Sequence, residues 1–429
     1  MALGAGDTIV ALSSGRPPAA IAVVRTSGPR ASALAQQVAG SLPPARQATL
    51  RRLIDPTDGN IIDDALVIRF AGPHSATGED VVEYQCHGGR ATVDALIAVL
   101  VRESGVRLAE PGEFTRRALA NGRLDLTEAE GLADLLAAET DLQRRSAMVR
   151  AGGGLRVRLD RWREQLLSLS ARAEVAIDYA DEEDGSLDND LSGALGDLST
   201  EIRMLAESPR VEPLRDGIRV VLAGPPNAGK SSLLNALVQA ERAIVTPIAG
   251  TTRDVIEVPV SISGIPFVLV DTAGLHESDD EVEAIGIARA RQETSSADIL
   301  LWLGAAEATP VHERLIVLLP KSDIPRDEAS NHALPVSSHT GQGIPELSTK
   351  LVGLALKLLP RKDEIALVRR ERDLLAEASD ALARAASLTD PVLVAEELRV
   401  ARTAIDRIAG RAGVEDLLDT LFGRFCLGK

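Results

Sequence analysis

A short glycine-rich segment in the middle of the chain places the tightest limit on its fold. Residues Gly224–Ser231 read G-x-x-x-x-G-K-S, and they stand between the apolar run Ile218–Ala223 and a stretch with helical periodicity. A strand that leads through such a loop into a helix cradles phosphate, because successive backbone N–H groups turn inward at the helix N-terminus. Lys230 would reach the outer phosphates, and the Ser231 hydroxyl would bind Mg²⁺. An ordinary glycine-rich turn is the alternative, and the Lys-Ser pair argues against it.

Three further apolar runs follow the loop, at Phe267–Val270, Ile299–Trp302 and Leu315–Leu319. Runs of this kind predict a mostly parallel sheet that is covered by helices. Asp271–Gly274 closes the first run as D-x-x-G. Its carboxylate can hold the Mg²⁺ shell, and its glycine amide can meet a terminal phosphate.

The last apolar run leads into Lys321–Asp323, which reads K-S-D. An aspartate there can accept hydrogen bonds from both N1–H and the exocyclic amine of guanine, a donor pair that adenine lacks. Val336–His339 could then cap the base. Pro320 stands where an asparagine usually begins this motif, so we expect weaker affinity with the specificity contact kept. The order and spacing of these segments predict a GTPase.

The polar segment Gly250–Asp254 lies between the phosphate loop and the D-x-x-G segment. Its Thr252 can complete the Mg²⁺ ligation, and a solvated turn is the alternative reading. Leu275 stands where Ras-like GTPases carry the glutamine that orients the attacking water, so another group must do that work. Arg253 could supply positive charge, although its position is more typical of a structural loop residue. A monovalent cation held by Asn227 would serve equally well.

Helical periodicity brackets this segment on both sides. Upstream, five apolar residues from Leu155 to Leu169 fall on one stripe, and a second block runs from about Glu364 to Phe422 with a break at Asp390–Pro391. Neither block can shield its own stripe, so we expect the two to pack together as one helical domain around an inserted one. The periodic residues are Leu155, Leu159, Trp162, Leu166 and Leu169, then Leu374, Leu375, Leu382, Leu393, Leu398, Ile405 and Ile408.

The first part of the chain alternates short apolar runs with turn signals. These predict strands at Ala19–Val24, Leu66–Phe70 and Val81–Cys86, followed by a helix after Gly89, and hence an α+β domain. We therefore expect a multidomain α+β and α/β protein. Its predicted parts are an N-terminal domain at 1–118, a first helical part at 119–212, an inserted Ras-like phosphate-loop GTPase domain at 213–361 and a second helical part at 362–429.

Composition restricts the partners. The net charge of −16 disfavours non-specific adhesion to nucleic acid or membrane, so a polyanion must meet a local basic patch. Aromatic residues make up only 2% of the chain, which argues against base-stacking platforms. Cys86 and Cys426 fit neither a metal site nor a disulfide framework, and no apolar stretch reaches the roughly 18 residues needed to span a bilayer. We therefore expect a cytoplasmic protein that does not enter the membrane.

Six short segments extend the pattern across the chain. They are Asp7–Val10, Thr77–Asp80, His87–Gly89, Pro111–Phe114, Leu124–Leu126 and the terminal Cys426–Lys429. Together with the nucleotide motifs, this set resembles the tRNA-modification GTPases of the MnmE or TrmE family over essentially the full chain. The C-terminal C-x-G-K is specific, because few other GTPases place helices on both sides of the GTPase domain and end in that tetrapeptide.

The resemblance implies that the N-terminal domain binds a tetrahydrofolate derivative, 5-formyl or 5,10-methylene, and mediates constitutive dimerisation. The family's folate contacts fall on Arg25, Glu83, Arg123 and Lys429. Basic side chains can pair with the glutamate tail of folate, while a carboxylate accepts hydrogen bonds from pterin N–H groups. Position 123 is commonly Lys in the family, so the geometry there can differ. A surface or interface ion pair is the alternative for each residue.

For the GTPase domain, the resemblance implies activation by K⁺-dependent dimerisation. An essential carboxylate maps onto Glu283, which taken alone reads as a solvated acid. Cys426 is a candidate nucleophile or a small packing residue, and Lys230 completes the catalytic candidates. The implied K⁺ ligands are Asn227, Thr246, Ile248 and Thr251, and the Mg²⁺ ligands are Ser231 and Thr252. The implied nucleotide contacts are Asn227, Ala228, Gly229, Lys230, Ser231, Ser232, Thr246, Pro247, Ile248, Ala249, Gly250, Thr251, Thr252, Asp271, Thr272, Ala273, Gly274, Lys321, Asp323, Ser337, Ser338 and His339.

The resemblance also implies partners. A separate flavoprotein of the MnmG (GidA) family, which uses FAD and NADH, would form a heterotetramer with this chain and modify the wobble uridine of certain tRNAs. A locally basic helical stretch with seven arginines between 144 and 163 offers modest support for tRNA contact, and a salt-bridged surface is its alternative. A GTP-controlled binding switch, such as an Era-like ribosome-assembly factor, is the competing function. A one-carbon enzyme acting alone is a weaker one.

Overall fold

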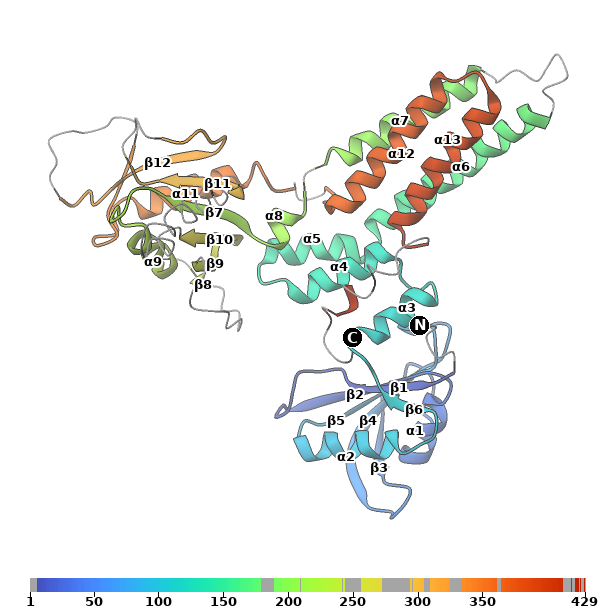
Figure 1. Ribbon diagram of the computed structural model, residues 1–429. Coiled ribbons are helices and arrows are strands. Elements are labelled where there is room, and N and C mark those ends of the chain that lie inside the picture. Colours follow the sequence, from blue (N-terminus) through green and yellow to red (C-terminus); the bar gives the residue numbers. More distant parts are fainter. Residues whose placement is uncertain are drawn as a thin grey trace, which may run out of the picture. The chain divides into compact units, whose positions relative to one another are not determined.

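Two compact units make up the computed structural model, each formed from several stretches of chain. The first comprises Met1–Ala133, Ala151–Arg163 and Ile405–Lys429, and the second comprises Asp134–Arg150 and Glu164–Ala404. Figure 1 labels their elements along the chain. The residues that the structure describes are 6–178, 189–208, 210–240, 242–243, 256–271, 294, 296–304, 309–324, 333–360, 364–411, 418, 421–423, 425 and 428.

A six-stranded sheet with the order β3-β4-β5-β2-β1-β6 lies at the centre of the first unit. Neighbouring strands are antiparallel except for β1 and β6, which are parallel. The three strands predicted in this region correspond to β2, β4 and β5 with shifted ends. The strands are β1 Thr8–Leu12, β2 Ile21–Ser27, β3 Thr49–Ile54, β4 Ile61–Phe70, β5 Val81–His87 and β6 Val106–Leu108.

Helices α1 (Ala31–Ala39) and α2 (Arg90–Val101) supply the apolar core of this sheet, as the predicted α+β fold requires. Side chains alternate between the two faces of a strand, so Val24 of β2 and Tyr84 of β5 are buried in that core. The intervening positions point to the other face and are only partly buried. That second face is therefore free to carry polar chemistry.

A partly buried network of charges joins the start of β1 to helix α3 (Glu113–Ala120). The Arg117 side chain, only 8% exposed, forms ion pairs with Asp7 at 2.7 Å, Glu79 at 3.1 Å and Glu113 at 3.0 Å. Arg107 binds Asp7 and Glu113 as well. Three of the segments that carry the family resemblance meet in this network, so they stabilise the fold.

The network shifts the pKa values of two of its acids in the same direction. Burial opposes ionisation of both Asp7 and Glu113, but the hydrogen bonds from Arg107 and Arg117 outweigh it and lower the pKa of each carboxyl group. Because their pKa is lower in the folded chain than in the unfolded chain, these acids stabilise the fold at neutral pH.

The second unit contains a seven-stranded sheet with the order β13-β12-β11-β7-β10-β9-β8. The five strands from β13 to β10 are parallel, and β9 and β8 continue the sheet antiparallel. The predicted mostly parallel sheet is therefore confirmed. Its strands are β7 Ile218–Ala223, β8 Arg242–Ala243, β9 Ile256–Ile262, β10 Ile265–Asp271, β11 Ile299–Trp302, β12 Leu315–Pro320 and β13 Leu334–Val336.

Helices α9 (Lys230–Ala240) and α11 (Ile344–Ala355) pack their leucines into the core of this sheet. Leu237 and Leu351 are fully buried there beside Phe267 of β10. The α/β layering that the phosphate-loop motif predicts is present (Figure 1).

Helices surround this α/β part in the sequence, as the leucine spacing predicts. They are α4 Leu126–Ala137, α5 Asp141–Ala151, α6 Gly154–Asp178, α7 Asn189–Ala206, the short α8 Glu212–Arg215, α12 Arg369–Ser387 and α13 Pro391–Ile408. Helices α7 and α12 lie side by side (Figure 1), joined by the Ser199 hydroxyl, which donates to the Ser379 carbonyl at 2.8 Å. All five stripe residues of α6 are buried.

The prediction is wrong for one residue of the apolar stripes. Leu393 is 49% exposed, and its neighbour Val394 is buried instead. Helix α13 begins at Pro391, and its buried face then runs through Val394, Leu398 and Ile405 at helical spacing. Near the start of this helix the buried stripe therefore passes through Val394, one residue after the predicted position.

Replacing Arg117 by methionine should strongly destabilise the first unit, because three carboxylates would lose their shared buried partner. Removing one side of a buried ion pair costs about 3–5 kcal/mol, and we expect a loss near the lower end of that range. Urea unfolding followed by circular dichroism at pH 7 measures it.

The same contribution should vanish in acid. Asp7 and Glu113 have lowered pKa values, so the stabilisation present at neutral pH is lost as the pH falls through their folded-state pKa values, below about pH 4. The control Arg52→Met removes an exposed pair with Asp64 and should leave the midpoint unchanged. A wild-type midpoint for Arg117→Met at pH 7 would contradict the assignment.

Candidate functional site

The phosphate loop joins the end of β7 to the start of α9. Gly224 has φ 154°, and a Cβ atom there would lie 2.9 Å from the Leu303 carbonyl oxygen, so only glycine fits. Asn227 adopts φ 60°, which turns the loop back toward the helix. The backbone thus takes the sharp turn that delivers amide groups to the N-terminus of α9, where a phosphate is bound most favourably.

Lys230 is the first residue of α9 and is only 4% exposed. Its Nζ donates to the carbonyl oxygens of Gly224 at 3.0 Å and Pro225 at 3.1 Å, so the ammonium spans the loop. Burial lowers the pKa of Lys230, and the nearby Asp271 carboxylate partly opposes that shift. The side chain is a positive charge held inside the loop, as binding of the outer phosphates requires.

The parallel pairing of β10 with β7 brings Asp271 to the edge of the sheet where the loop begins. The Ser231 hydroxyl donates to its carboxylate at 2.5 Å. A hydroxyl and a carboxylate are the oxygen ligands that Mg²⁺ prefers. These two residues therefore fit a magnesium ion, with Ser231 as a direct ligand and Asp271 supporting its shell.

The two segments predicted to hold the base meet at the same edge of the sheet. Strand β13 pairs with β12, which brings Ser337 beside Asp323, and the hydrogen bond from Ser337 lowers the pKa of Asp323. The His339 amide donates to the Ser337 hydroxyl oxygen at 3.2 Å. Lys321 reaches across to the Asn227 carbonyl at 3.3 Å, which links this segment to the phosphate loop. Asp323, the predicted acceptor for guanine, therefore lies in a segment that contacts the phosphate loop.

A second polar site lies on the partly buried face of the N-terminal sheet. Arg25 of β2 and Glu83 of β5 are cross-strand neighbours, and two guanidinium nitrogens donate to the Glu83 carboxylate at 2.7 and 2.9 Å. Their side chains are 19% and 17% exposed. The Phe114 ring lies 5.5 Å from the Arg25 guanidinium carbon, an aromatic contact that the sequence motifs did not reveal.

The C-terminal segment returns to this sheet. The Gly428 carbonyl accepts a hydrogen bond from the Ser13 hydroxyl at 2.9 Å. Gly428 has φ 90°, and a Cβ atom there would lie 2.2 Å from the Leu12 carbonyl oxygen, so the contact demands glycine. Leu12 and Ala11 of β1 pair with β2, and the partner of Ala11 is Arg25. The residue before Lys429 thus lies against the strand beside Arg25.

Comparison with known proteins agrees with this arrangement over the whole chain. Residues 126–426 match the family model of the MnmE helical domain, and residues 8–123 match that of the GTP-binding protein TrmE N-terminus. The chain belongs to the MnmE family of tRNA modification GTPases. Two tRNA modification GTPases MnmE, from Erythrobacter litoralis and Rhizorhabdus wittichii, are each 53% identical to it.

These two relatives align with 99% of this chain and with 100% and 97% of their own lengths. Among solved structures, the G domain of the T. maritima FeoB iron transporter aligns with 32% of this chain and 98% of that chain, at 28% identity and a TM-score of 0.24. That score is too low to add to the family assignment. As a member of the MnmE family, the chain is a GTPase, and the family implies Mg²⁺ binding.

Part of the predicted nucleotide site lies outside the described residues, as do the C-terminal candidates Cys426 and Lys429. The predicted nucleotide contacts that the structure describes are Asn227, Ala228 and Gly229 in the loop, Lys230, Ser231 and Ser232 in the first turn of α9, Asp271, Lys321 and Asp323, and Ser337, Ser338 and His339. The predicted residues outside the described parts are Thr246, Pro247, Ile248, Ala249, Gly250, Thr251, Thr252, Arg253, Thr272, Ala273, Gly274, Leu275, Glu283, Cys426 and Lys429.

Arg123 contacts a different part of the N-terminal domain from the Arg25–Glu83 pair. Its Nε donates to the Ser75 carbonyl at 3.1 Å, and its side chain packs near Gly78. Arg123 therefore supports the loop that precedes β5. Of the three described residues that the resemblance assigns to folate, Arg25 and Glu83 bind each other directly.

The arginine-rich stretch does not form one basic face. Arg144 and Arg145 both pair with Asp141, Arg156 pairs with Glu128, and Arg150 is buried. These ion pairs favour the salt-bridged alternative, so this stretch gives little support for contact with RNA.

Cys86 packs inside the N-terminal sheet. It is 2% exposed, and burial raises the pKa of its thiol, which keeps it protonated and unreactive. Cys86 is therefore a packing residue of this core. In the described parts of the chain, no helix is both long and apolar enough to cross a bilayer.

Changing Asp323 to asparagine should shift the nucleotide preference. The amide replaces one acceptor by a donor, which matches xanthine and not guanine, so we expect the KM for GTP to rise by about 10–100-fold and xanthosine triphosphate to be hydrolysed better than GTP. Steady-state hydrolysis of both nucleotides measures the change. The control Asp373→Asn, at a 71% exposed position on α12, should behave as wild type. An unchanged preference would exclude Asp323 as the base acceptor.

Proposed function

We propose that this GTPase works with a flavoprotein of the MnmG (GidA) type to place an aminomethyl-type group, such as carboxymethylaminomethyl, at C5 of the wobble uridine in certain tRNAs. The partner would bring FAD and NADH and form a heterotetramer with this chain. The observation that carries the proposal is that one chain holds both a guanine-nucleotide site and the Arg25–Glu83 pair beside its own C-terminal segment. The relatives that match its full length are named for tRNA modification.

The Arg25–Glu83 pair would hold a tetrahydrofolate, either 5-formyl or 5,10-methylene, which supplies the carbon of the new group. A carboxylate such as Glu83 accepts hydrogen bonds from pterin N–H groups, and the guanidinium of Arg25 can pair with a folate carboxylate. Phe114 offers an apolar surface beside them. Arg123 and Lys429 complete the proposed set. Cys426, two residues before Gly428, is a candidate for the chemistry.

GTP hydrolysis would drive movement of the GTPase domain and not the carbon transfer itself. Lys230 would hold the outer phosphates and Ser231 the Mg²⁺ ion, while Glu283 would position the attacking water. A potassium ion bound by Asn227 with Thr246, Ile248 and Thr251 would supply the charge that an arginine finger gives elsewhere. We expect the active protein to be a cytoplasmic homodimer whose GTPase domains meet across the two subunits.

Removing the gene from its host should abolish the modified wobble nucleoside, because the reaction would lose its GTPase component. Mass spectrometry of nucleosides from purified tRNA measures the loss. A plasmid copy should restore the nucleoside, and a Lys230→Ala copy should not, since Lys230 holds the phosphates. An unchanged nucleoside profile in the deletion strain would refute the proposal.

A folate titration distinguishes this proposal from a GTP-controlled binding switch such as an Era-like ribosome-assembly factor. We expect the wild-type protein to bind 5-formyl-tetrahydrofolate saturably in isothermal titration calorimetry. The affinity should fall about tenfold or more in Arg25→Met and in Glu83→Gln, because each variant loses charge-assisted hydrogen bonds. Arg52 and Asp64 form another cross-strand pair on the same sheet, so Arg52→Met is the matched control and should bind normally.

In a binding switch, the domains outside the GTPase domain only recruit partners, so there is no reason for them to bind folate. The absence of saturable binding by the wild-type protein would therefore favour the binding switch and remove the folate step from the proposal.

A further inference from the structure

Within the second unit, the chain passes from the helices to the α/β part and later returns to the helices. The two connecting segments lie side by side. Arg210, on the way out, forms a parallel bridge with Leu367, on the way back, and the Val211 amide donates to the Leu367 carbonyl at 3.2 Å. The Arg369 amide donates to the Glu212 carboxylate at 2.7 Å. We call these two segments, 210–212 and 366–369, the crossing segments.

Arg150 of helix α5 fastens the returning segment. Its guanidinium donates to the Ala366 carbonyl at 3.0 Å and to both oxygens of Glu371 at 3.1 and 3.2 Å. Glu371 in turn accepts the Val368 amide at 3.0 Å. The Arg150 and Glu371 side chains are 2% and 0% exposed, so the pair has no solvent to replace a lost partner.

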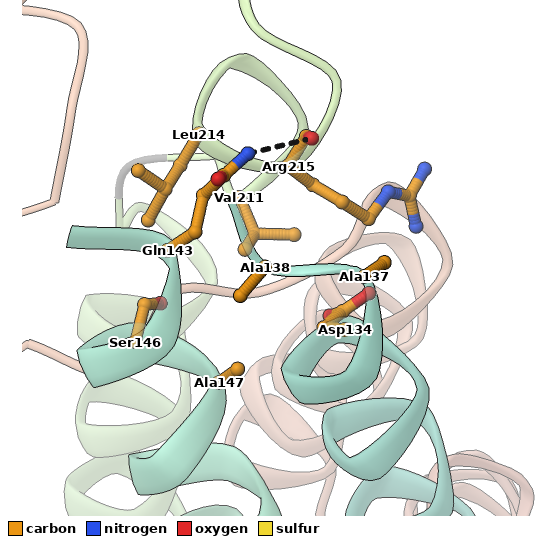
Figure 2. A pocket seen from close by; sticks show the side chains of 9 residues that line it. All are labelled: Asp134, Ala137, Ala138, Gln143, Ser146, Ala147, Val211, Leu214 and Arg215. Atoms are coloured by element: carbon orange, nitrogen blue, oxygen red, sulfur yellow. Dashed lines mark hydrogen bonds between the residues drawn. The ribbon is translucent and has the colours of Figure 1, made fainter. Parts of the chain in front are cut away.

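The same helix also holds the outgoing segment. Figure 2 shows Gln143 of α5 reaching the carbonyl oxygen of Arg215, to which it donates at 3.2 Å. Val211 and Leu214 are buried against α4 and α5, where they line a cavity of about 20 Å³ together with Ala138. Both ends of the inserted domain are thus attached to α5.

The positions on α5 explain how one helix can hold both segments. Gln143 and Arg150 are seven residues apart, which is two helical turns and places them on one face. Asp134 of α4 lies 3.9 Å from the Arg150 guanidinium and adds a second acid on that side. The partners of Arg150 named here all lie outside the phosphate loop and the guanine segments.

We propose that Arg150 is a positioning residue that transmits movement of the GTPase domain to helices α5 and α12 and takes no part in GTP hydrolysis. The inference rests on the proposed function, because it assigns a route to the movement that hydrolysis would drive. A displacement of the inserted domain acts on both crossings at once, and the buried hydrogen bonds of Arg150 oblige α5 and the start of α12 to follow. A looser attachment would let the domain move without them.

A set of three variants tests this inference in the full-length protein. Arg150→Met removes the guanidinium that pairs with the buried Glu371 carboxylate. Arg150→Met/Glu371→Met replaces the whole pair by apolar side chains of similar size, which is often neutral for stability. Arg144→Met is the control on the same helix, because its pair with Asp141 is exposed. Each variant replaces the wild-type copy in the deletion strain, and the purified proteins are assayed in parallel.

We expect both Arg150 variants to keep kcat and KM for GTP within about twofold of wild type, while the modified nucleoside falls about tenfold. The double variant should recover most of the melting temperature that Arg150→Met loses, with a small deficit from the Ala366 carbonyl and Val368 amide that lose their partners. It should not recover modification, because those two backbone groups stay unanchored. Arg144→Met should match wild type in all three measurements.

Recovery of both melting temperature and modification in the double variant would overturn the inference, since the pair would then serve stability alone. A parallel loss of GTP hydrolysis in both variants would overturn it as well. If the wild-type copy itself fails to restore the nucleoside, the proposed function fails. If the wild-type copy and the Arg150 variants restore it equally, the proposed function stands and the inference about Arg150 is overturned.

Discussion

The α/β part of the second unit stands in the chain between two helices that pack together, α7 and α12, and this sets a physical constraint on the molecule. The chain must leave the helices and come back, and each crossing exposes backbone groups that no regular helix or sheet satisfies. Here the two crossings satisfy each other through the Val211 amide and the Leu367 carbonyl, and Arg150 binds what is left. The nucleotide site depends on this junction, because β7, which delivers the phosphate loop, begins at Ile218, only a few residues after it.

Both units use a buried arginine to join segments that are distant in sequence. Arg117 gathers Asp7, Glu79 and Glu113, and Arg150 gathers Glu371 and the Ala366 carbonyl. A guanidinium suits this task because its planar set of donors can serve several acceptors at once. The cost of burying the charge is offset only while every partner is in place, so such a site tolerates one arrangement of the surrounding segments.

The strands and the phosphate loop of the α/β part could be predicted from the sequence, because the residues that define them are close together in the chain. Gly224, Lys230 and Ser231 sit in one short loop, and the strand that ends at Asp271 is a continuous apolar run. The sheet topology then places Asp271 beside Ser231 without further information. Strands of weaker pattern, such as β9 and β13, were not anticipated.

The rest of the site depends on contacts between distant residues, which no local pattern encodes. The position of Phe114 under Arg25 follows from how α3 packs on β1, and the burial of Arg150 follows from the crossing segments. In sequence, Arg150 is one arginine among several in a basic stretch, and only the structure separates it from the exposed ones. Leu393 shows the same limit, since a one-residue difference in the buried face of α13 moves it to the surface.

The seat of Gly428 has a consequence for how the molecule is made. Its carbonyl meets the Ser13 hydroxyl across 415 positions of chain, so this contact must close a far longer loop than the pairing of β1 with β2 beside it. Contacts of such long range are slow to form, so we expect the seat of Gly428 to be completed after the neighbouring strands have paired.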